Sequence, residues 1–307
     1  MRPKNLSREE EDWKRQGPKR IMNRRDLLKQ TAMFGLAAGL PRGAEAQNQD
    51  PALSSDSVPV AFVISKGAEV MDFCGPWEVF RTVWTKDKPF FRLYTVAQTR
   101  NPVAVGGGMK IVPDYTFGTA PAPKLIVIPA QDGETPEMVQ WIRTASKGAD
   151  IVMSVCTGAF ILARTGLLSG KSATTHHGAY FALAANYPDI HLKRGARWVD
   201  EDHVMSAGGI SSGIDLALHV VEKYCGRRQA ENVVDAMEYQ GQGWLHPDSN
   251  EAYKMVSLGT DERPRCAVCQ MEADKNIKSV FAGRTYYFCS KRCQELFDKH
   301  PKVVEQP

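Results

Sequence analysis

Two short runs of this chain are almost continuously apolar, and they restrict its fold more than any other feature. They are Leu125–Ile128 and Ile151–Val155. A strand that is apolar on both faces has to be covered on both sides, which is typical of the central strands of a parallel sheet. Helices usually provide this cover, so the two runs indicate an α/β architecture.

Strand-like and helical patterns alternate along the middle of the chain. Strands are predicted at residues 58–64, 91–97, 125–129, 151–155 and 204–207. Helices are predicted at residues 76–84, 135–146, 158–165, 179–185, 213–224 and 228–239. This order predicts a flavodoxin-like, mostly parallel sheet sandwiched by helices, with a small cysteine-knuckle domain after it. Ligands in such folds bind at the carboxyl ends of the strands.

Composition divides the 307 residues into five predicted parts. They are a signal peptide (1–46), a linker (47–57), an α/β domain (58–240), a second linker (241–264) and a four-cysteine domain (265–304). The formal net charge is only +4, and much of it lies in the first 25 residues. The remainder has no basic stripe, so no nucleic-acid partner is expected.

The N-terminal segment has the features of an export signal. Arg24 and Arg25 precede an apolar run, Thr31 to Leu40, which is too short to cross a bilayer core of roughly 30 Å. A small-x-small sequence, Ala44 to Ala46, follows as a cleavage site. The segment resembles a twin-arginine (Tat) signal, which implies passage through the Tat translocase and a periplasmic location. The alternative is an amphipathic N-terminal helix that stays attached.

A candidate nucleophile lies between a buried strand and a helix. Cys156 has small neighbours two positions away on either side, Ser154 and Gly158, as a nucleophile elbow requires. The first amides of the following helix and its dipole should favour a thiolate. The residues alone leave a second interpretation open, because a free cysteine is often a small core residue.

Three sequence blocks together resemble one family. They run from Asp72 to Phe80, from Cys156 to His176 and from Ser206 to Ala217. In this order and spacing they resemble the PfpI branch of the class I glutamine-amidotransferase-like superfamily. Within that branch they are most similar to the isonitrile hydratases and to the ligand-side domains of AraC-type regulators. The resemblance covers residues 58–240 and implies a homodimer.

The resemblance also implies a set of site residues. Cys156 matches the nucleophile, Asp72 the acid beside its sulfur, and Thr157 the polar neighbour. The backbone amides of Ala130, Gln131 and Thr157 are expected to form the anion-stabilising pocket. Two departures stand out: peptidase members carry histidine at the position of Thr157, and relatives show paired glycines where Ala130 and Gln131 stand. The alternative for Asp72 is a loop carboxylate stabilised by a helix dipole.

Two further motifs are interpreted as structural rather than chemical. His176 and His177 follow a short strand, and we expect a polar loop pair without chemistry, although a supporting position at the site is the alternative. Gly106–Gly108 is expected to form the turn of a hairpin, since no helix follows it as in a phosphate-binding loop.

The resemblance predicts a cysteine-dependent hydratase or hydrolase, a cysteine-nucleophile lyase that converts an isonitrile and water into an N-substituted formamide. Its α/β domain would need a small-molecule substrate and no cofactor. Two alternatives remain: a non-catalytic periplasmic protein that binds or senses a small molecule or metal, and a defence enzyme that acts on reactive carbonyls.

Four cysteines near the C-terminus form a CxxC…CxxxC pattern. They are Cys266, Cys269, Cys289 and Cys293. Paired thiolates at this spacing suit tetrahedral zinc, and thiolates also select Cu(I). The region resembles the TRASH/YHS group of small metal-binding domains, with a hairpin and a C-terminal helix. Disulfide pairing is the alternative in an oxidising periplasm.

Overall fold

The computed structural model describes residues 57–305, except for residues 86, 256 and 261. The predicted signal peptide and nearly all of the first linker lie outside the described residues. Within the described part, no helix has both the length and the apolar character needed to cross a membrane.

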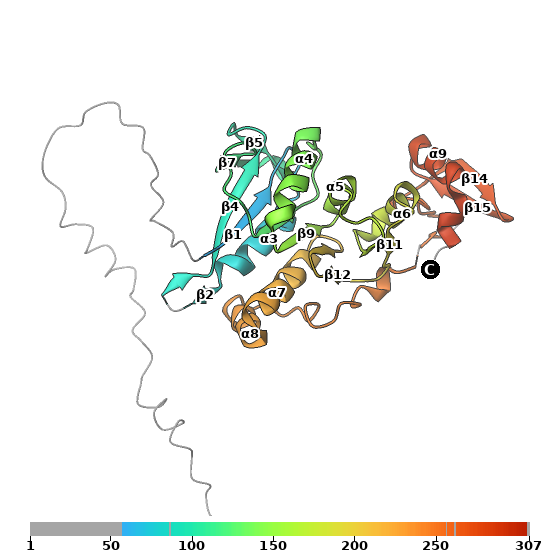
Figure 1. Cartoon of the computed structure of the whole chain (residues 1–307). Coiled ribbons are helices and arrows are strands. Elements are labelled where there is room, and N and C mark those ends of the chain that lie inside the picture. The colour runs from blue at the N-terminus through green and yellow to red at the C-terminus, as the bar shows by residue number, and fades with distance from the viewer. Residues whose placement is uncertain (1–56, 86, 256, 261, 306–307) are drawn as a thin grey trace, which may run out of the picture. The chain divides into compact units, whose positions relative to one another are not determined.

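A seven-stranded sheet forms the centre of the α/β domain (Figure 1). Its strand order is β12-β13-β9-β8-β1-β4-β7, and every pair is parallel except β12 with β13. The strands are β1 (Val58–Val63), β4 (Phe91–Ala97), β7 (Tyr115–Thr116), β8 (Leu125–Ile128), β9 (Ile151–Val155), β12 (Trp198–Glu201) and β13 (Val204–Ala207). All five predicted strands are confirmed. Within this sheet, the two edge strands β7 and β12 were not predicted, because they are short and partly polar.

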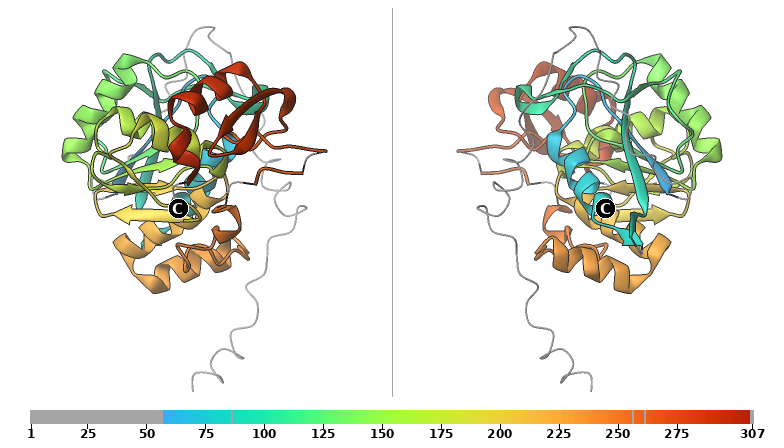
Figure 2. Two further views of the ribbon diagram at one scale, coloured as in Figure 1. Left: turned by 90° about the vertical axis from the view of Figure 1, so that its right-hand side faces the viewer. Right: turned by 90° about the vertical axis from the view of Figure 1, so that its left-hand side faces the viewer.

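Helices cover both faces of this sheet, as the apolar central strands require. In β1, Val60 and Phe62 pack into one apolar cluster, whereas Ala61 and Val63 pack into another. The first cluster holds α3 (Val70–Arg81), α7 (Ser212–Cys225) and α8 (Arg227–Ala236), and the second holds α4 (Pro136–Ala145) and α5 (Gly158–Arg164). Figure 2 shows α7 and α8 (orange) on the opposite side of the sheet from α4 (green).

Short elements complete the domain. They are β2 (Trp84–Thr85), β3 (Lys88–Pro89), β5 (Val103–Ala104), η2 (Gly106–Gly108), β6 (Lys110–Ile111), η3 (Ser146–Gly148), β10 (Ser172–Ala173), η4 (His177–Ala179), α6 (Tyr180–Asn186), β11 (His191–Leu192) and η5 (Glu251–Tyr253). The three glycines connect β5 and β6, which pair antiparallel, so the predicted hairpin turn is confirmed.

One predicted helix was wrong at both ends, and the other five are confirmed to within a few residues. The helix expected at residues 76–84 is α3, which begins at Val70 and ends at Arg81. The prediction placed Pro76 in the first turn, where proline is common. Instead Pro76 is buried inside the helix, which loses one backbone hydrogen bond there. Asp72 consequently lies within the first turn of α3 rather than in a loop.

The segment expected to link the two domains packs against the α/β domain over part of its length. Trp244 is only 4 % exposed and belongs to the same apolar cluster as α3 and α7. The Trp198 indole Nε1 donates to the Gly243 carbonyl oxygen over 3.0 Å, and the Arg227 guanidinium lies over the Trp244 ring. Asn250 is also buried. This segment is therefore available to shape a site on the domain.

The cysteine module, residues 265–304, consists of a hairpin and a helix. The hairpin pairs β14 (Asp274–Phe281) with β15 (Arg284–Phe288), and α9 (Lys291–Lys299) and η6 (Pro301–Glu305) follow. Both the predicted hairpin and the C-terminal helix are confirmed. The Phe297 ring contacts other module aromatics and also stacks on Phe181 of α6 at 5.9 Å. The module thus shares a small apolar cluster with the α/β domain.

Gly158, the first residue of α5, lies against the backbone at the end of β8. A Cβ atom there would clash with the Ile128 carbonyl oxygen and lie 2.9 Å from the Pro129 carbonyl. Both obstacles are backbone atoms, so we expect Gly158→Ala to destabilise the domain by about 3 kcal/mol. Thermal unfolding followed by circular dichroism should show a melting temperature lower by roughly 5–10 °C. Gly148→Ala, where a Cβ meets open space, is the control and should change little. Equal melting temperatures for both variants would contradict the packing argument.

Candidate functional site

Cys156 lies at the carboxyl end of β9, in the tight turn that leads into α5. Its φ of 56° is in the left-handed region, which is uncommon for any residue but glycine. The turn is held because the Cys156 amide donates to the carbonyl oxygens of Ala207 and Gly208, at 3.2 and 2.9 Å. The Thr175 hydroxyl donates to the Cys156 carbonyl oxygen over 2.8 Å. This strained geometry is typical of a nucleophile elbow.

Two backbone amides donate to the Cys156 sulfur, those of Thr157 and Ile210. The Thr157 amide was expected there, but Ile210 was not recognised from the sequence. Ile210 has a φ of 36°, which is unusual for a β-branched residue. It lies in the loop after β13, and β13 pairs directly with β9. The sequence did contain a signal for this contact, because Gly208 and Gly209 follow the predicted strand at residues 204–207 directly before Ile210.

Asp72 is fully buried beside this turn. Its Oδ2 accepts a hydrogen bond of 3.0 Å from the Ala130 amide. Its Oδ1 is also buried and has no hydrogen-bond partner among the residues that the structure describes. The pKa of Asp72 is raised to about 7, because burial raises it more than the hydrogen bond from the Ala130 amide lowers it, and the charge of Glu69 adds to the rise. A buried, half-satisfied carboxyl group whose pKa is near neutrality is suited to proton transfer.

The expectation of an unusually acidic sulfur was wrong for this structure. The pKa of the Cys156 thiol is raised to about 11, first by burial and then by the charge of Asp72, and the two amides only partly oppose this. Cys156 is 7 % exposed, and α5 has only seven residues, so little dipole stabilisation is available. Asp72 is therefore the first of the pair to lose its proton, and the sulfur stays a thiol at neutral pH.

The other two expected pocket residues make different contacts. The Ala130 amide is engaged by Asp72, as described above. The Gln131 side-chain Nε2 donates to the Val63 carbonyl oxygen at 3.2 Å, and its Oε1 is buried without a partner in the described part of the chain. The amides that reach the sulfur are those of Thr157 and Ile210. Ala130 thus acts on the site through the carboxyl group of Asp72.

His176 and His177 lie closer to the nucleophile turn than the polar-loop interpretation assumed. A Cβ on Gly209 would lie 2.6 Å from His176 Cδ2, so this ring packs against the loop that carries Ile210. His176 Nδ1 accepts from the Gly178 amide at 3.1 Å. Burial lowers the pKa of both histidines, which favours the neutral rings. His176 thereby supports the position of the Ile210 loop.

The four C-terminal cysteines form a second candidate site. Their sulfur atoms all lie within 4.8 Å of one another. The Cys269–Cys289 sulfur distance is 3.4 Å and the Cys289–Cys293 distance is 3.7 Å. Tetrahedral zinc with Zn–S bonds of about 2.3 Å requires sulfur atoms about 3.8 Å apart. All seven cysteines of the chain are free thiols, and the spacing in this cluster fits a shared metal ion.

Backbone amides also support a metal at this cluster. Amides of Val268, Cys269 and Cys289 donate to the Cys266 sulfur, and the Met271 amide donates to the Cys269 sulfur. Such hydrogen bonds stabilise thiolates and fix their orientation around a metal. The donor set therefore fits a thiophilic ion, and zinc and Cu(I) both satisfy it.

Comparison with known proteins identifies both regions. Residues 58–223 match the DJ-1/PfpI family. The chain belongs to the DJ-1/PfpI family. Residues 267–303 match the YHS domain, so the DJ-1/PfpI domain is followed here by a YHS region that contains the cysteine cluster.

The relatives of this chain have names that point to different functions. The chain is 31 % identical to isonitrile hydratase from Pseudomonas putida over 188 residues, which cover 60 % of this chain and 79 % of that protein. It is 28 % identical to the HTH-type transcriptional regulator CdhR of Pseudomonas aeruginosa, covering 56 % of this chain and about half of the regulator, 52 %.

Solved structures agree on the fold. A THiJ/PfpI family protein from Pseudomonas syringae superposes with a TM-score of 0.55 at 28 % identity, covering 66 % of this chain and 83 % of that chain. Drosophila melanogaster DJ-1beta has a TM-score of 0.52 at 18 % identity, covering 59 % of this chain and 98 % of that chain. The second likeness concerns the DJ-1/PfpI fold alone.

Proposed function

We propose that this protein hydrates isonitriles, converting R–NC and water into an N-substituted formamide. The observation that carries the proposal is the pairing of a strained cysteine at an elbow with a fully buried carboxyl group whose pKa is about 7. Addition to an isonitrile needs a nucleophile and a proton donor that act on the same carbon atom, and this pair supplies both. The similarity to an isonitrile hydratase points to the same reaction.

In the proposed first half-reaction, the Asp72 carboxylate accepts the thiol proton as the Cys156 sulfur bonds to the terminal carbon. The amides of Thr157 and Ile210 stabilise negative charge on the sulfur while the proton moves. Asp72 then gives the proton to that carbon, which leaves a thioimidate, R–N=CH–S, on Cys156. The S–H bond has thus been added across one carbon, and no electrons are gained or lost.

In the proposed second half-reaction, the water oxygen bonds to the thioimidate carbon and one water proton goes to the nitrogen. As the carbon–sulfur bond breaks, the remaining water proton passes from the new hydroxyl group through Asp72 to the Cys156 sulfur, and the product R–NH–CHO leaves. One water molecule is consumed in each turnover. The chemistry needs no redox or organic cofactor in the α/β domain.

Isonitrile turnover tests the proposal. We expect the protein to release formamide from a small isonitrile and Cys156→Ala to release none, as measured by gas chromatography. Cys225→Ala is the matched control because Cys225 is a half-buried thiol at the end of α7, and it should retain activity. Product formation by Cys156→Ala at the wild-type rate would contradict the assigned nucleophile.

A second candidate function, ligand binding without turnover, is favoured by one observation. Cys156 is only 7 % exposed and its pKa is raised to about 11, so its resting state is a poorly nucleophilic thiol. Regulators are also among the relatives. Tight binding of an isonitrile or formamide with no product over many hours would favour this candidate over the hydratase.

For the remainder of the chain we propose a YHS domain that holds zinc or Cu(I) through its four cysteines. Export by the Tat route and a homodimer remain predictions from the sequence. The metal would be acquired before export, because the Tat route carries folded proteins.

A further inference from the structure

A cavity of about 150 Å³ lies beside the nucleophile turn and is not explained by the proposed chemistry. One wall is the loop Gly209–Ser211, and the facing wall is formed by His176, His177 and Tyr253. A second cavity of about 130 Å³ shares His177, Tyr180 and Tyr253 with the first. We call the first cavity the aromatic pocket.

The aromatic pocket is connected to the nucleophile through Ile210. Ile210 lines it, and the amide of the same residue donates to the Cys156 sulfur. The same residue therefore contributes to the pocket lining and to the environment of the nucleophile. The isonitrile group is linear, so a substituent in the pocket could direct the terminal carbon past Ile210 toward the sulfur.

Three flat rings contact one another along the pocket, the His176–His177 pair tilted and the His177–Tyr253 pair stacked. His176 and His177 have ring centroids 4.2 Å apart, and His177 and Tyr253 are 4.7 Å apart with an interplanar angle of 24°. Tyr253 is 52 % exposed, so its ring remains available for contact. A cavity of about 150 Å³ is large enough for benzene in an apolar protein interior. Size and lining both fit one flat ring.

The polar groups of the pocket do not require a charged ligand. The Arg197 guanidinium lines it, but its Nε donates to the buried Asp215 carboxylate at 2.7 Å. A further Arg197 nitrogen donates to Asn250 Oδ1 at 3.2 Å. The positive charge is thus balanced within the protein. A neutral ligand is favoured over an anion, because an anion would compete with Asp215.

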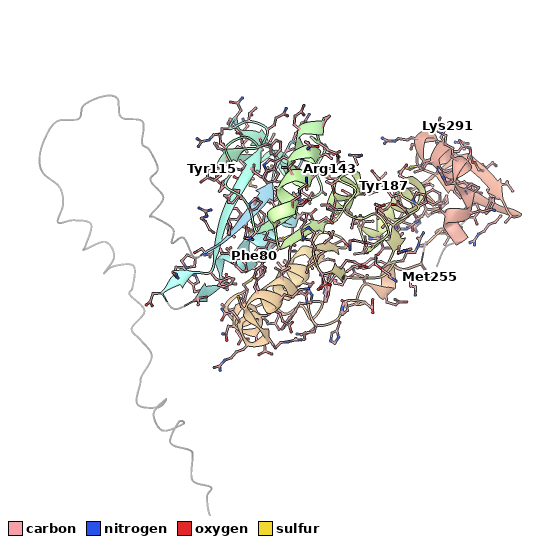
Figure 3. All side chains as sticks on the ribbon, viewed as in Figure 1. Phe80, Tyr115, Arg143, Tyr187, Met255 and Lys291 are labelled. Atoms are coloured by element: carbon pink, nitrogen blue, oxygen red, sulfur yellow. The ribbon has the colours of Figure 1, made fainter. Side chains whose placement is uncertain are left out.

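We propose that the aromatic pocket binds a neutral aromatic ring of the substrate, so that aryl and benzyl isonitriles are preferred and Tyr253 determines this specificity. The inference rests on the proposed function. Tyr253 and Asn250 lie outside residues 58–223, which match the family. The segment that carries both residues therefore forms part of the pocket wall, although it lies beyond the matched domain. It ends near Met255, which is strongly exposed and labelled in Figure 3.

Substrate comparison with variants tests the proposal. We expect Tyr253→Ala to lower kcat/KM for benzyl isonitrile by roughly 3- to 10-fold, mainly by raising KM, since one aromatic stacking contact is lost. Turnover of tert-butyl isonitrile should change less than twofold, and Tyr253→Phe should behave like the wild type. Trp84→Ala is the matched control, because Trp84 is 53 % exposed and lines neither described cavity.

A binding measurement separates this proposal from the proposed function. N-benzylformamide is titrated into Cys156→Ala with and without Tyr253→Ala and followed by NMR. If the wild type turns over no isonitrile, but N-benzylformamide binds Cys156→Ala and binding weakens without Tyr253, the pocket stands and the hydratase proposal fails. If benzyl and tert-butyl isonitriles respond equally to Tyr253→Ala, or if N-benzylformamide does not bind at millimolar concentration, the pocket proposal is overturned.

Discussion

We expect Asp72→Asn to lower isonitrile turnover by about 10²- to 10⁴-fold and, at the same time, to make Cys156 react faster with iodoacetamide. The loss of turnover follows because asparagine cannot accept and return the thiol proton. The gain in alkylation follows because the charge of Asp72 raises the pKa of Cys156, and its removal makes the thiolate easier to form. A fall of one pKa unit would give about tenfold faster alkylation at pH 8.

The difference in alkylation rate between the wild type and Asp72→Asn should depend on pH. Below pH 7 the Asp72 carboxyl group is mostly protonated, since its pKa is about 7, so it exerts little repulsion on the sulfur. The alkylation rates of wild type and Asp72→Asn should therefore converge at pH 6 and separate above pH 7. The wild-type rate should keep rising toward pH 11 without a plateau near neutrality. Mass spectrometry of the Cys156 peptide measures both rates.

Loss of folding should not explain the lost turnover. The folded-state pKa of Asp72 is raised above its ordinary value of 3.8, so folding favours the protonated form and stability falls as the pH rises from about 4 to about 7. A raised pKa of this size corresponds to about 4 kcal/mol against the ionised form. At pH 8 Asp72→Asn should be at least as stable as the wild type. Glu78→Gln, an exposed carboxylate on α3, is the control and should leave both reactions unchanged. Alkylation that is slower in Asp72→Asn than in the wild type at pH 8 would contradict the assignment of Asp72 as the proton-transfer group.

The sequence was most informative where burial is uniform along an element. The almost continuously apolar runs at β8 and β9 predicted central parallel strands, and both occupy the middle of the sheet. Their position placed Cys156 at the carboxyl edge of the sheet. The two-residue strand β7 and the half-polar β12 gave no comparable signal, because neither is apolar over a run long enough to show a period.

The site was predicted less completely because it depends on contacts between loops distant in sequence. Ala130 and Asp72 are 58 residues apart, and their hydrogen bond depends on the approach of the β8 loop to α3. Ile210 reaches the sulfur only because β13 pairs with β9. No local pattern reports either contact.

The direction of the Cys156 pKa shift could not be predicted for a related reason. The sequence showed the favourable amides of an elbow, but not how deeply the sulfur would be buried beside Asp72 and Glu69. Those two unfavourable effects depend on the packed structure, and together they outweigh the amides.

Removing the metal that we propose at the four cysteines should unfold the cysteine module and leave the α/β core folded. The module has one short hairpin and the nine-residue helix α9, and Phe297 is its central side chain. A unit of about 40 residues rarely buries enough apolar surface to fold alone. Structural zinc contributes about 10–16 kcal/mol to the folding free energy of comparable small domains. The free energy lost with the metal should therefore exceed the remaining stability of the module.

Hydrogen exchange measured by mass spectrometry should show this loss. After chelation, or in Cys269→Ser, amides of β14, β15 and α9 should lose protection, while those of β1 and β9 keep it. Cys225→Ser is the matched control, since Cys225 lies outside the cluster. Unchanged protection after chelation, with protection lost only on treatment with a reductant, would instead support disulfide pairing.

The contact between α6 and the module extends the same prediction to the α/β domain. Phe181 of α6 stacks on Phe297, and Arg194 donates to the Val303 carbonyl oxygen at 3.3 Å. Both contacts should be lost when the module unfolds, so α6 should exchange faster than the rest of the α/β domain. Protection should therefore decrease from β9 through α6 to α9 in the metal-free protein. This gradient distinguishes unfolding of the module from damage to the whole chain, which would lower the protection of β1 and β9 as well.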